Sequence, residues 1–400
     1  MMKSSSTQVL WLKVWALALV QGAVILVWVI YNLYLVELLT QFGFSETLAV
    51  GLLIIENVLA AVMEPLMGSL SDRAQQWMGS QFPMIAFGLI LSSGCFIGIP
   101  AVVIFGVGSA PVRWLLPMML VAWALAMTVF RSPAISLLGR YAFSTQLPQA
   151  ASILTLVGGI SGALGPLAGT WILSLGPGIT FAIGSFVLLA AAAALRQVNP
   201  TVGITDASPA STQQTVQPFS WSGLGFIFGT GFGVALGFRC LMTGFPALVK
   251  AQMPDGPTSL IVGLIFIAIA VVAIPGGQLA GYLGNRRTMA LGLIILAGLG
   301  LLAGGAGNAV IAALIALGFG ASFSIVSNGT IPFALSLVPP QKAGLGTGMY
   351  FSGGAVSSAL FGALSDTTAS LAPSFIVSIG SLFFVLASAC IVSSPRFAKS

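Results

Sequence analysis

The sequence predicts an all-α membrane protein of twelve transmembrane helices arranged as two six-helix halves. Three observations support this prediction: 57% of the 400 residues are hydrophobic, only 6% are charged, and the mean hydropathy is +1.06. A soluble chain would need about 25% charged residues to cover its surface. Composition therefore makes the lipid bilayer the first expected partner of this chain.

Apolar runs of about 20 residues, the length of a helix that crosses a bilayer, alternate with short polar segments. The first run follows Lys3 and Lys13 and is too long for a signal-peptide core, so we expect it to remain as the first helix. The predicted spans are 14–39, 47–70, 82–107, 113–134, 150–174, 178–196, 221–249, 259–282, 288–306, 308–333, 343–365 and 371–393.

Six spans precede and six follow residues 197–220, which are rich in Pro, Ser, Thr and Gln. Such a composition is typical of a flexible linker. The predicted organisation is therefore an N-terminal half at 1–196, a cytoplasmic linker at 197–220 and a C-terminal half at 221–400.

The Lys and Arg residues predict the orientation, because they concentrate in cytoplasmic segments. With a cytoplasmic N-terminus, Arg113 and Lys250 lie outside and Arg131 and Arg239 lie within spans. The remaining ten of the 14 basic residues lie inside: Lys3, Lys13, Arg73, Arg140, Arg196, Arg286, Arg287, Lys342, Arg396 and Lys399. We expect both termini to be cytoplasmic, in a bacterial inner membrane. The basic residues are dispersed singly, so no nucleic acid partner is expected.

Charged residues inside the predicted spans are the main candidates for function. Each costs about 2.5–3.5 kcal/mol at the centre of a bilayer, so the four residues Glu56, Glu64, Arg131 and Arg239 would together cost on the order of 10 kcal/mol if they faced lipid. They are therefore expected to face a watery cavity, to pair with one another or to bind protons.

Glu56 is the candidate for proton coupling, because span 2 places it near mid-depth. The chain contains no histidine, so a proton that crosses the membrane must be carried mainly by carboxyl groups. The alternative for Glu56 is a structural carboxyl that bonds a neighbouring helix. Glu64, two turns further along, is expected to act in gating or as the partner of an arginine. No cofactor is expected, and a proton gradient is the expected energy source.

Polar and aromatic residues in several spans are candidates for a substrate cavity. Trp28, Tyr31 and Asn32 share a region of span 1 with Tyr34, and such a face suits a sugar ring or a flat apolar molecule. The alternative, strongest for Tyr34, is an aromatic belt at the membrane interface. Asn328 lies deep in span 10, where the alternative is a hydrogen bond between helices.

The two intramembrane arginines have similar alternatives. Arg131, near the inner end of span 4, is expected to pair with Glu56 or Glu64, or to extend to the interface. Arg239, in the outer half of span 7, is expected to line the cavity from the second half or to pair with Glu37.

A short repeat relates the two halves. Residues 68–73 are GSLSDR and residues 281–286 are GYLGNR, each at the end of the second span of its half. Internal duplication is typical of transporters whose halves rock around a central site.

With this motif in the loop after span 2 and the six-plus-six layout, the sequence resembles the major facilitator superfamily. The resemblance implies a fold with alternating access and a gating role for the residues of both motif copies. These are Gly68, Asp72, Arg73, Gly281, Asn285 and Arg286. It also implies a monomer.

A narrower resemblance is to the sucrose:proton symporters and the related glycoside–pentoside–hexuronide transporters of bacteria. It is carried by residues 55–73, 131–152, 328–348 and 362–366. The acid–Asn pair of those relatives is matched by Glu56-Asn57, which makes Asn57 a cavity candidate, and their span 4 arginine by Arg131. The sequence departs from them at Gly79-Ser80-Gln81, where they carry a Gly-Arg-Arg run.

We therefore expect a secondary active transporter, by proton-coupled symport of a sugar or similar small-molecule substrate. One alternative is proton-driven efflux of amphipathic compounds, because GGISGALGPLAG at 158–169 resembles a motif of drug:proton antiporters. Close packing of helices explains those glycines equally well. A second alternative is a non-transporting membrane assembly factor, since pigment-delivery proteins also resemble this superfamily. An enzyme is not expected, because the sequence has no nucleotide-binding loop, metal cluster or nucleophile with a base.

Overall fold

A computed structural model describes residues 9–106, 112–199 and 219–395 of the chain. Within these residues the regular structure is entirely helical, and twelve helices have 18 or more residues. The long helices of the first half are α1 (Trp11–Gln41), α2 (Glu46–Met78), α3 (Phe82–Gly106), α4 (Leu115–Ser136), α6 (Leu147–Ser174) and α7 (Pro177–Gln197). Those of the second half are α8 (Trp221–Gln252), α9 (Thr258–Leu283), α10 (Asn285–Leu302), α11 (Ala309–Ser336), α12 (Ala343–Ala363) and α14 (Pro373–Ser393). Short helices lie between them: α5 (Leu138–Tyr141), α13 (Ser365–Ser370), η1 (Val112–Trp114), η3 (Ala303–Gly305) and η4 (Pro340–Lys342).

The predicted fold class is confirmed, and each predicted span corresponds to one long helix. The boundary of α2 is different, because the helix continues from the predicted end at residue 70 to Met78. It ends at Gly79, which has φ +68°, a left-handed conformation common just after a helix end. The GSLSDR motif therefore lies on the helix and not in the following loop. Most of the predicted linker lies outside the described residues.

Eleven of the described helices are long and apolar enough to cross a membrane. α12 is the remaining long helix, and its six glycines and three serines reduce its hydropathy. It packs between α2 of the first half and α8 of the second, so its small residues meet protein rather than lipid. Small residues at such positions let helices approach closely inside a bilayer.

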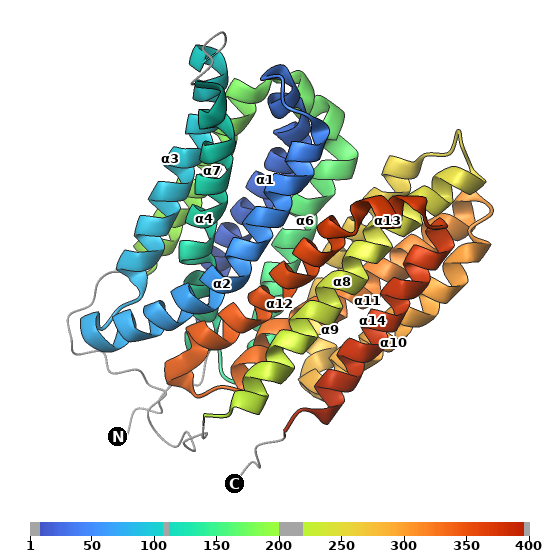
Figure 1. The fold of residues 1–400 in the computed structure, drawn as a ribbon. Helices are drawn as coiled ribbons and strands as arrows, with labels where there is room; N and C mark the ends of the chain where they lie inside the picture. The colour runs from blue at the N-terminus through green and yellow to red at the C-terminus, as the bar shows by residue number, and fades with distance from the viewer. Residues whose placement is uncertain (1–8, 107–111, 200–218, 396–400) are drawn as a thin grey trace, which may run out of the picture.

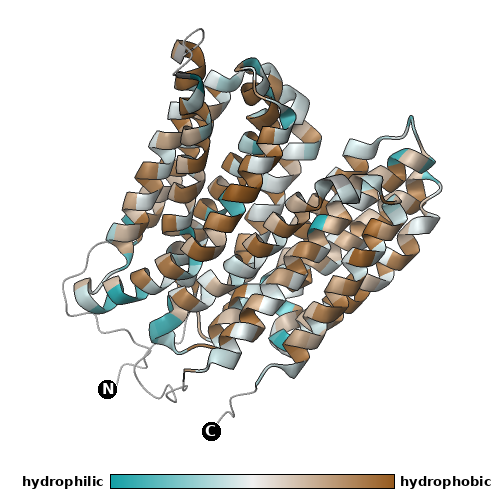
Figure 2. Cartoon of the chain, viewed as in Figure 1, coloured by the Kyte–Doolittle hydropathy of each residue, from teal (hydrophilic) through white to brown (hydrophobic). Residues whose placement is uncertain are grey.

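The outer surface of the bundle is apolar, as expected of a protein surrounded by lipid. Large apolar side chains such as Phe105, Trp221 and Tyr282 are among its most exposed residues. Figure 2 shows the hydrophilic residues gathered mainly at the two ends of the helices, with few along their length. A soluble protein does not expose apolar area on this scale.

Each half has its own core. One large cluster of buried apolar residues consists of first-half residues together with Ile331, and a second large cluster lies wholly within the second half. Figure 1 shows the halves as two bundles that approach at the lower end, where α1 begins and α14 ends, and diverge toward the upper end. We call the lower end the termini side and the other end the opposite side.

Helices α2 and α12, and helices α6 and α9, join the two halves. On the termini side the α2–α12 backbones are almost in contact: a Cβ at Gly68 would collide with the Gly344 carbonyl, and one at Gly348 with the Glu64 carbonyl. Further toward the opposite side the contact is made by side chains, as where Ile54 lies beside Gly362. The closest packing of the halves is therefore on the termini side.

Candidate functional site

Glu56 and Tyr31 form a buried hydrogen bond between α2 and α1. The Tyr31 hydroxyl donates to Glu56 Oε1 at 2.5 Å, and only 4% of Glu56 is exposed. The other carboxyl oxygen, Oε2, is buried and has no hydrogen-bond partner among the described residues. Glu56 lies ten residues into α2, roughly 15 Å along its axis, so the carboxyl sits at mid-depth with a neutral partner.

Aromatic rings hold this pair in place. Trp123 of α4 lies 4.5 Å from the Tyr31 ring and 4.8 Å from the Trp28 ring, centroid to centroid. Phe96 of α3 contacts the same tryptophan at 5.1 Å. Tyr31 is fully buried and Trp28 is partly buried. The rings fix the direction of the Tyr31 hydroxyl, and they leave Trp28 as the ring of this group that is partly accessible.

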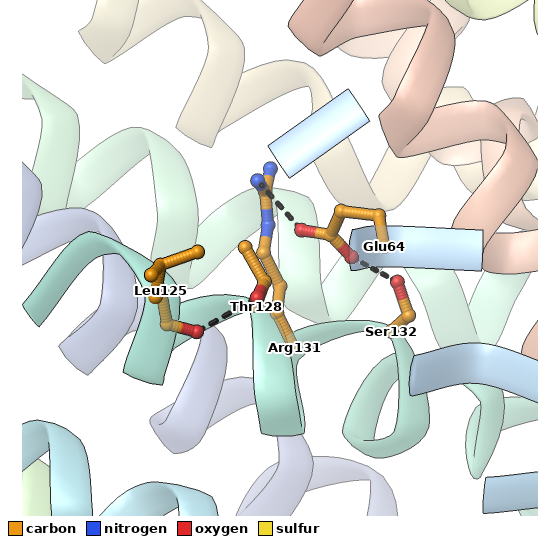
Figure 3. Close-up of polar contacts among 5 residues, drawn as sticks. All are labelled: Glu64, Leu125, Thr128, Arg131 and Ser132. Carbon is orange, nitrogen blue, oxygen red and sulfur yellow. Dashed lines mark hydrogen bonds and ion pairs between the residues drawn. The ribbon is translucent and has the colours of Figure 1, made fainter. Parts of the chain in front are cut away.

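Glu64, on the same helix, has a cationic partner instead. Arg131 Nη1 of α4 lies 3.5 Å from Glu64 Oε1, and the Ser132 hydroxyl donates to the other carboxyl oxygen. Figure 3 shows the carboxylate held between these two neighbouring residues of α4. The Glu64 side chain is 1% exposed, so the ion pair compensates the burial of its charge. Of the two partners predicted for Arg131, the structure places Glu64 beside it.

Arg131 also reaches the second half of the molecule. Its guanidinium lies over the ring of Phe351 on α12, 4.0 Å from the centroid, at the distance of a cation–π contact. The Arg131 side chain remains 33% exposed. A chain of contacts from Glu64 through Arg131 to Phe351 therefore crosses the boundary between the halves.

Asp72 joins the halves on the termini side. Its carboxylate accepts hydrogen bonds from the backbone N–H groups of Gly344 and Leu345, at 2.8 and 2.9 Å. These N–H groups belong to the first turn of α12, whose own N-cap residue makes no side-chain cap. A carboxylate there satisfies otherwise unpaired donors and complements the positive end of the helix dipole.

The two copies of the motif adopt different structures. Ser71 continues α2, but its counterpart Gly284 has φ +87° and separates α9 from α10. Asn285, the counterpart of Asp72, consequently begins a new helix and donates to the Gly329 carbonyl of α11, within its own half. The helix break at this glycine accompanies the difference between Asp72, which bonds the other half, and Asn285, which bonds its own half.

The arginines of the two copies also differ. Arg73 is exposed and makes no hydrogen bond or ion pair with another described residue. Arg286 donates to the backbone carbonyls of Ser394 and Pro395, after the end of α14. Gly281 of the second copy lies beside Gln149 of α6, where a hollow of about 420 Å³ opens on the termini side.

The remaining predicted cavity residues are placed as follows. Arg239 Nε donates to the Ser358 hydroxyl of α12 at 3.0 Å and is not bonded to Glu37, which instead accepts from Gln41. Asn32 and Asn57 donate to carbonyls of their own helices, Trp28 and Leu53.

Asn328 and Tyr34 lie in the helix-packing regions. Asn328 is 0% exposed and donates to the Ala273 carbonyl of α9, the interhelical bond that was its alternative. Tyr34 is buried against Phe181, and its hydroxyl bonds Ile172, so the interfacial belt expected for it is wrong.

Several residues of the site were not predicted from the sequence: Trp123, Ser132, Phe351 and Ser358. Ser132 follows Arg131 directly, which is the only local signal among them. The others belong to apolar or small-residue segments, and their place depends on the rotation of one helix against another.

The glycine-rich stretch of α6 has a packing role in the structure. Gly159 lies against the backbone of Ala270 and Phe266 on α9, and Gly162 lies against the ring of Phe266. Gly158, Gly165 and Gly169 face α1 on the other side. These contacts account for the small residues without reference to a substrate.

Comparison with known proteins agrees with this architecture. A family model described as the Major Facilitator Superfamily matches residues 17–363. No match is found among curated proteins. Among solved structures, the human organic anion transporter MFSD10 has a TM-score of 0.72 at 15% identity, covering 95% of this chain and 98% of that one.

Two further structures are similar, and their descriptions name an outward-facing state. A bacterial homologue of the iron transporter ferroportin has a TM-score of 0.73 at 14% identity, with 95% of this chain and 98% of that chain covered. The transporter FucP in its outward conformation has a TM-score of 0.68 at 15% identity, with 95% and 99% covered. At these identities the likeness concerns the fold.

Proposed function

Since the chain belongs to the major facilitator superfamily and is a multi-pass membrane transporter rather than an enzyme, we propose that it carries a sugar or a similar small organic solute together with a proton. The carrier works by alternating access, in which the two halves rock about their common interface. Glu56 binds and releases the proton.

The observation that supports proton coupling is the difference between the two glutamates of α2. Glu64 has an arginine beside it, whereas Glu56 has a tyrosine hydroxyl at 2.5 Å and an oxygen without a partner. An ionised carboxylate without a cationic partner at this depth is costly. Glu56 is therefore neutral in this conformation, and it releases its proton when rocking of the halves opens it to water.

The interface on the termini side supports alternating access. Asp72 and the glycine contacts of α2 and α12 close this side, while the halves diverge toward the opposite side. We propose that both termini lie in the cytoplasm of a bacterial cell, in the inner membrane, which makes this the outward-facing state of a monomer. Arg73, Gly281, Asn285 and Arg286 take part in gating when the second motif copy closes.

The solute is proposed to bind between the halves, near Trp28, Asn32, Asn57, Arg131 and Arg239. Asn328 of α11, buried against α9 in this structure, becomes part of this site only if α9 and α11 separate during the cycle. Partly accessible aromatic and amide groups on α1 suit a sugar ring.

The experiment uses purified protein in liposomes that contain a pH-sensitive dye. Solutes are added outside, and proton entry is compared for the wild type and Glu56→Gln. The amide oxygen of Gln can still accept from Tyr31, so the variant removes the proton site with little change in packing. Glu46→Gln is the matched control, because Glu46 is exposed in the first turn of the same helix.

Proton entry that requires a solute, persists in Glu46→Gln and is lost in Glu56→Gln supports the proposal. Proton exit driven by amphipathic drugs would identify an exporter instead. Solute entry without proton movement would overturn the role of Glu56. Co-purification with a pigment or partner protein, without any transport, would support the assembly factor.

A further inference from the structure

We propose that the transported solute is an organic anion that binds Arg131 and Arg239 along one face of α12. This inference rests on the proposed transport function and narrows its substrate class. A sugar remains eligible if it carries a carboxylate, as a uronic acid does.

The accessible intramembrane charges are positive. Arg131 is 33% exposed at its side chain and Arg239 belongs to the exposed residues, whereas the two glutamates of α2 are buried. A guanidinium that faced lipid would cost several kcal/mol, so the exposed parts of both arginines face water inside the protein. Of these four charged groups within the spans, the two that a solute can reach are therefore cations.

Both arginines contact the same face of α12, from different halves of the molecule. Arg131 of the first half lies over Phe351, and Arg239 of the second half bonds Ser358. These two residues are seven positions apart, which is about 10 Å along the helix and about 20° around it. Gly354 lies between them on this face and, like both of them, is partly exposed.

Both guanidinium groups keep donors that no described residue uses. Ser358 is the only hydrogen-bond partner of Arg239 in the described part of the chain. Arg131 makes one ion pair, through Nη1 at 3.5 Å, and its Nη2 has no hydrogen-bond partner among the described residues. A carboxylate accepts two parallel hydrogen bonds from a guanidinium, so an anion satisfies these donors and a neutral solute satisfies them less well. Phe351 is partly exposed, and the part of its ring that Arg131 does not cover offers apolar surface to a ring-shaped part of the solute.

The test measures thermal unfolding of the detergent-purified chain with matched pairs of solutes. Each anion is paired with a neutral analogue: glucuronate with glucose, lactate with 1,2-propanediol, and benzoate with benzyl alcohol. The variants are Arg131→Gln, Arg239→Gln and the double variant Glu64→Gln/Arg131→Gln, which leaves no unpaired buried charge. Lys250→Gln is the control, because it removes an exposed positive charge at the end of α8.

The expected result is stabilisation by at least one anion and not by its neutral partner. Each arginine variant should lower the affinity for that anion about tenfold or more, since a charge-assisted hydrogen bond contributes about 1.5–3 kcal/mol. Lys250→Gln should retain the wild-type affinity. Thermal unfolding without solute shows whether each variant is folded. Arg131→Lys keeps the positive charge and should bind the anion more tightly than Arg131→Gln does.

Three results would overturn the inference: equal stabilisation by a neutral partner, an anion that binds both arginine variants unchanged, or no stabilisation by any anion of the panel. The proposed function is tested separately by proton entry into liposomes. If a neutral solute drives proton entry, the transport proposal is supported and the inference that the solute is an anion is rejected.

Discussion

The carboxylate of Asp72 accepts a 2.8 Å hydrogen bond from the backbone N–H of Gly344, across 272 positions of sequence. One side chain of the first half thus caps a helix of the second half. The cap lies where the two backbones are closest, beside Gly68. Closure of the termini side therefore depends on both a charge and the absence of side chains.

Removing the carboxylate should open the termini side. Asp72→Ala loses two hydrogen bonds to an ionised group, each contributing about 1.5–3 kcal/mol. A cysteine introduced at Gln149, between α6 and α9, reports this opening. We expect it to react with an impermeant maleimide several-fold faster in Asp72→Ala than in the chain that keeps Asp72. The measurement uses a chain in which Cys95, Cys240 and Cys390 are replaced. Asp255→Asn, on an exposed loop residue, should leave the rate unchanged, and an equal rate in Asp72→Ala would contradict the gating role.

A methyl group at Gly348 should have a similar effect by a steric route. Its Cβ would collide with the Glu64 carbonyl, and a backbone atom of a packed helix cannot move aside as a flexible side chain can. We expect Gly348→Ala to shift the chain toward a conformation open on the termini side, measured with the same cysteine. Gly298→Ala is the control, because a Cβ there meets nothing within 4 Å. Identical labelling of both variants would show that the α2–α12 contact does not limit opening.

Arg131→Gln should destabilise the chain more than the double variant Glu64→Gln/Arg131→Gln. The single change leaves a carboxylate that is 1% exposed without its cation, and breaking a buried pair costs about 3–5 kcal/mol. Partial exposure of Arg131 places the expected loss at about 2–3 kcal/mol. Thermal unfolding in detergent measures the difference. If the double variant is the less stable of the two, the ion pair is not what retains Glu64 in its buried position.

Tyr31→Phe should impair proton coupling while keeping the fold. The change removes the one hydrogen bond found for the Glu56 carboxyl in the described residues and keeps the ring against Trp123. We expect a loss of about 1–3 kcal/mol in stability and slower solute-driven proton entry into liposomes. Tyr34→Phe also removes a buried hydroxyl, which bonds Ile172 and not a carboxyl. Tyr34→Phe should reduce stability without slowing proton entry, so an equal loss of proton entry in both variants would argue against a special role for Tyr31.

Much of the fold was predictable because the relevant properties are local. The bilayer thickness sets the length of each apolar run, so twelve helices and two halves follow from the sequence. Glu56, Glu64 and Arg131 were identifiable because a charge within an apolar run is costly in a bilayer, whichever neighbours its helix later packs against. α12 was also predicted, although it is the long helix that is missing from the eleven apolar enough to cross a membrane.

The tertiary structure decided the partners of these residues. Two glutamates eight positions apart on α2 differ because the rotation and neighbours of that helix bring a tyrosine to one and an arginine to the other. The same holds for Phe351 and Ser358, which the packing of α12 against both halves brings to Arg131 and Arg239. The two motif copies look alike in sequence, yet Asn285, which follows a positive-φ glycine, bonds its own half. Depth and length are properties of a single segment, whereas pairing depends on how distant helices rotate and pack against one another, which no local pattern encodes.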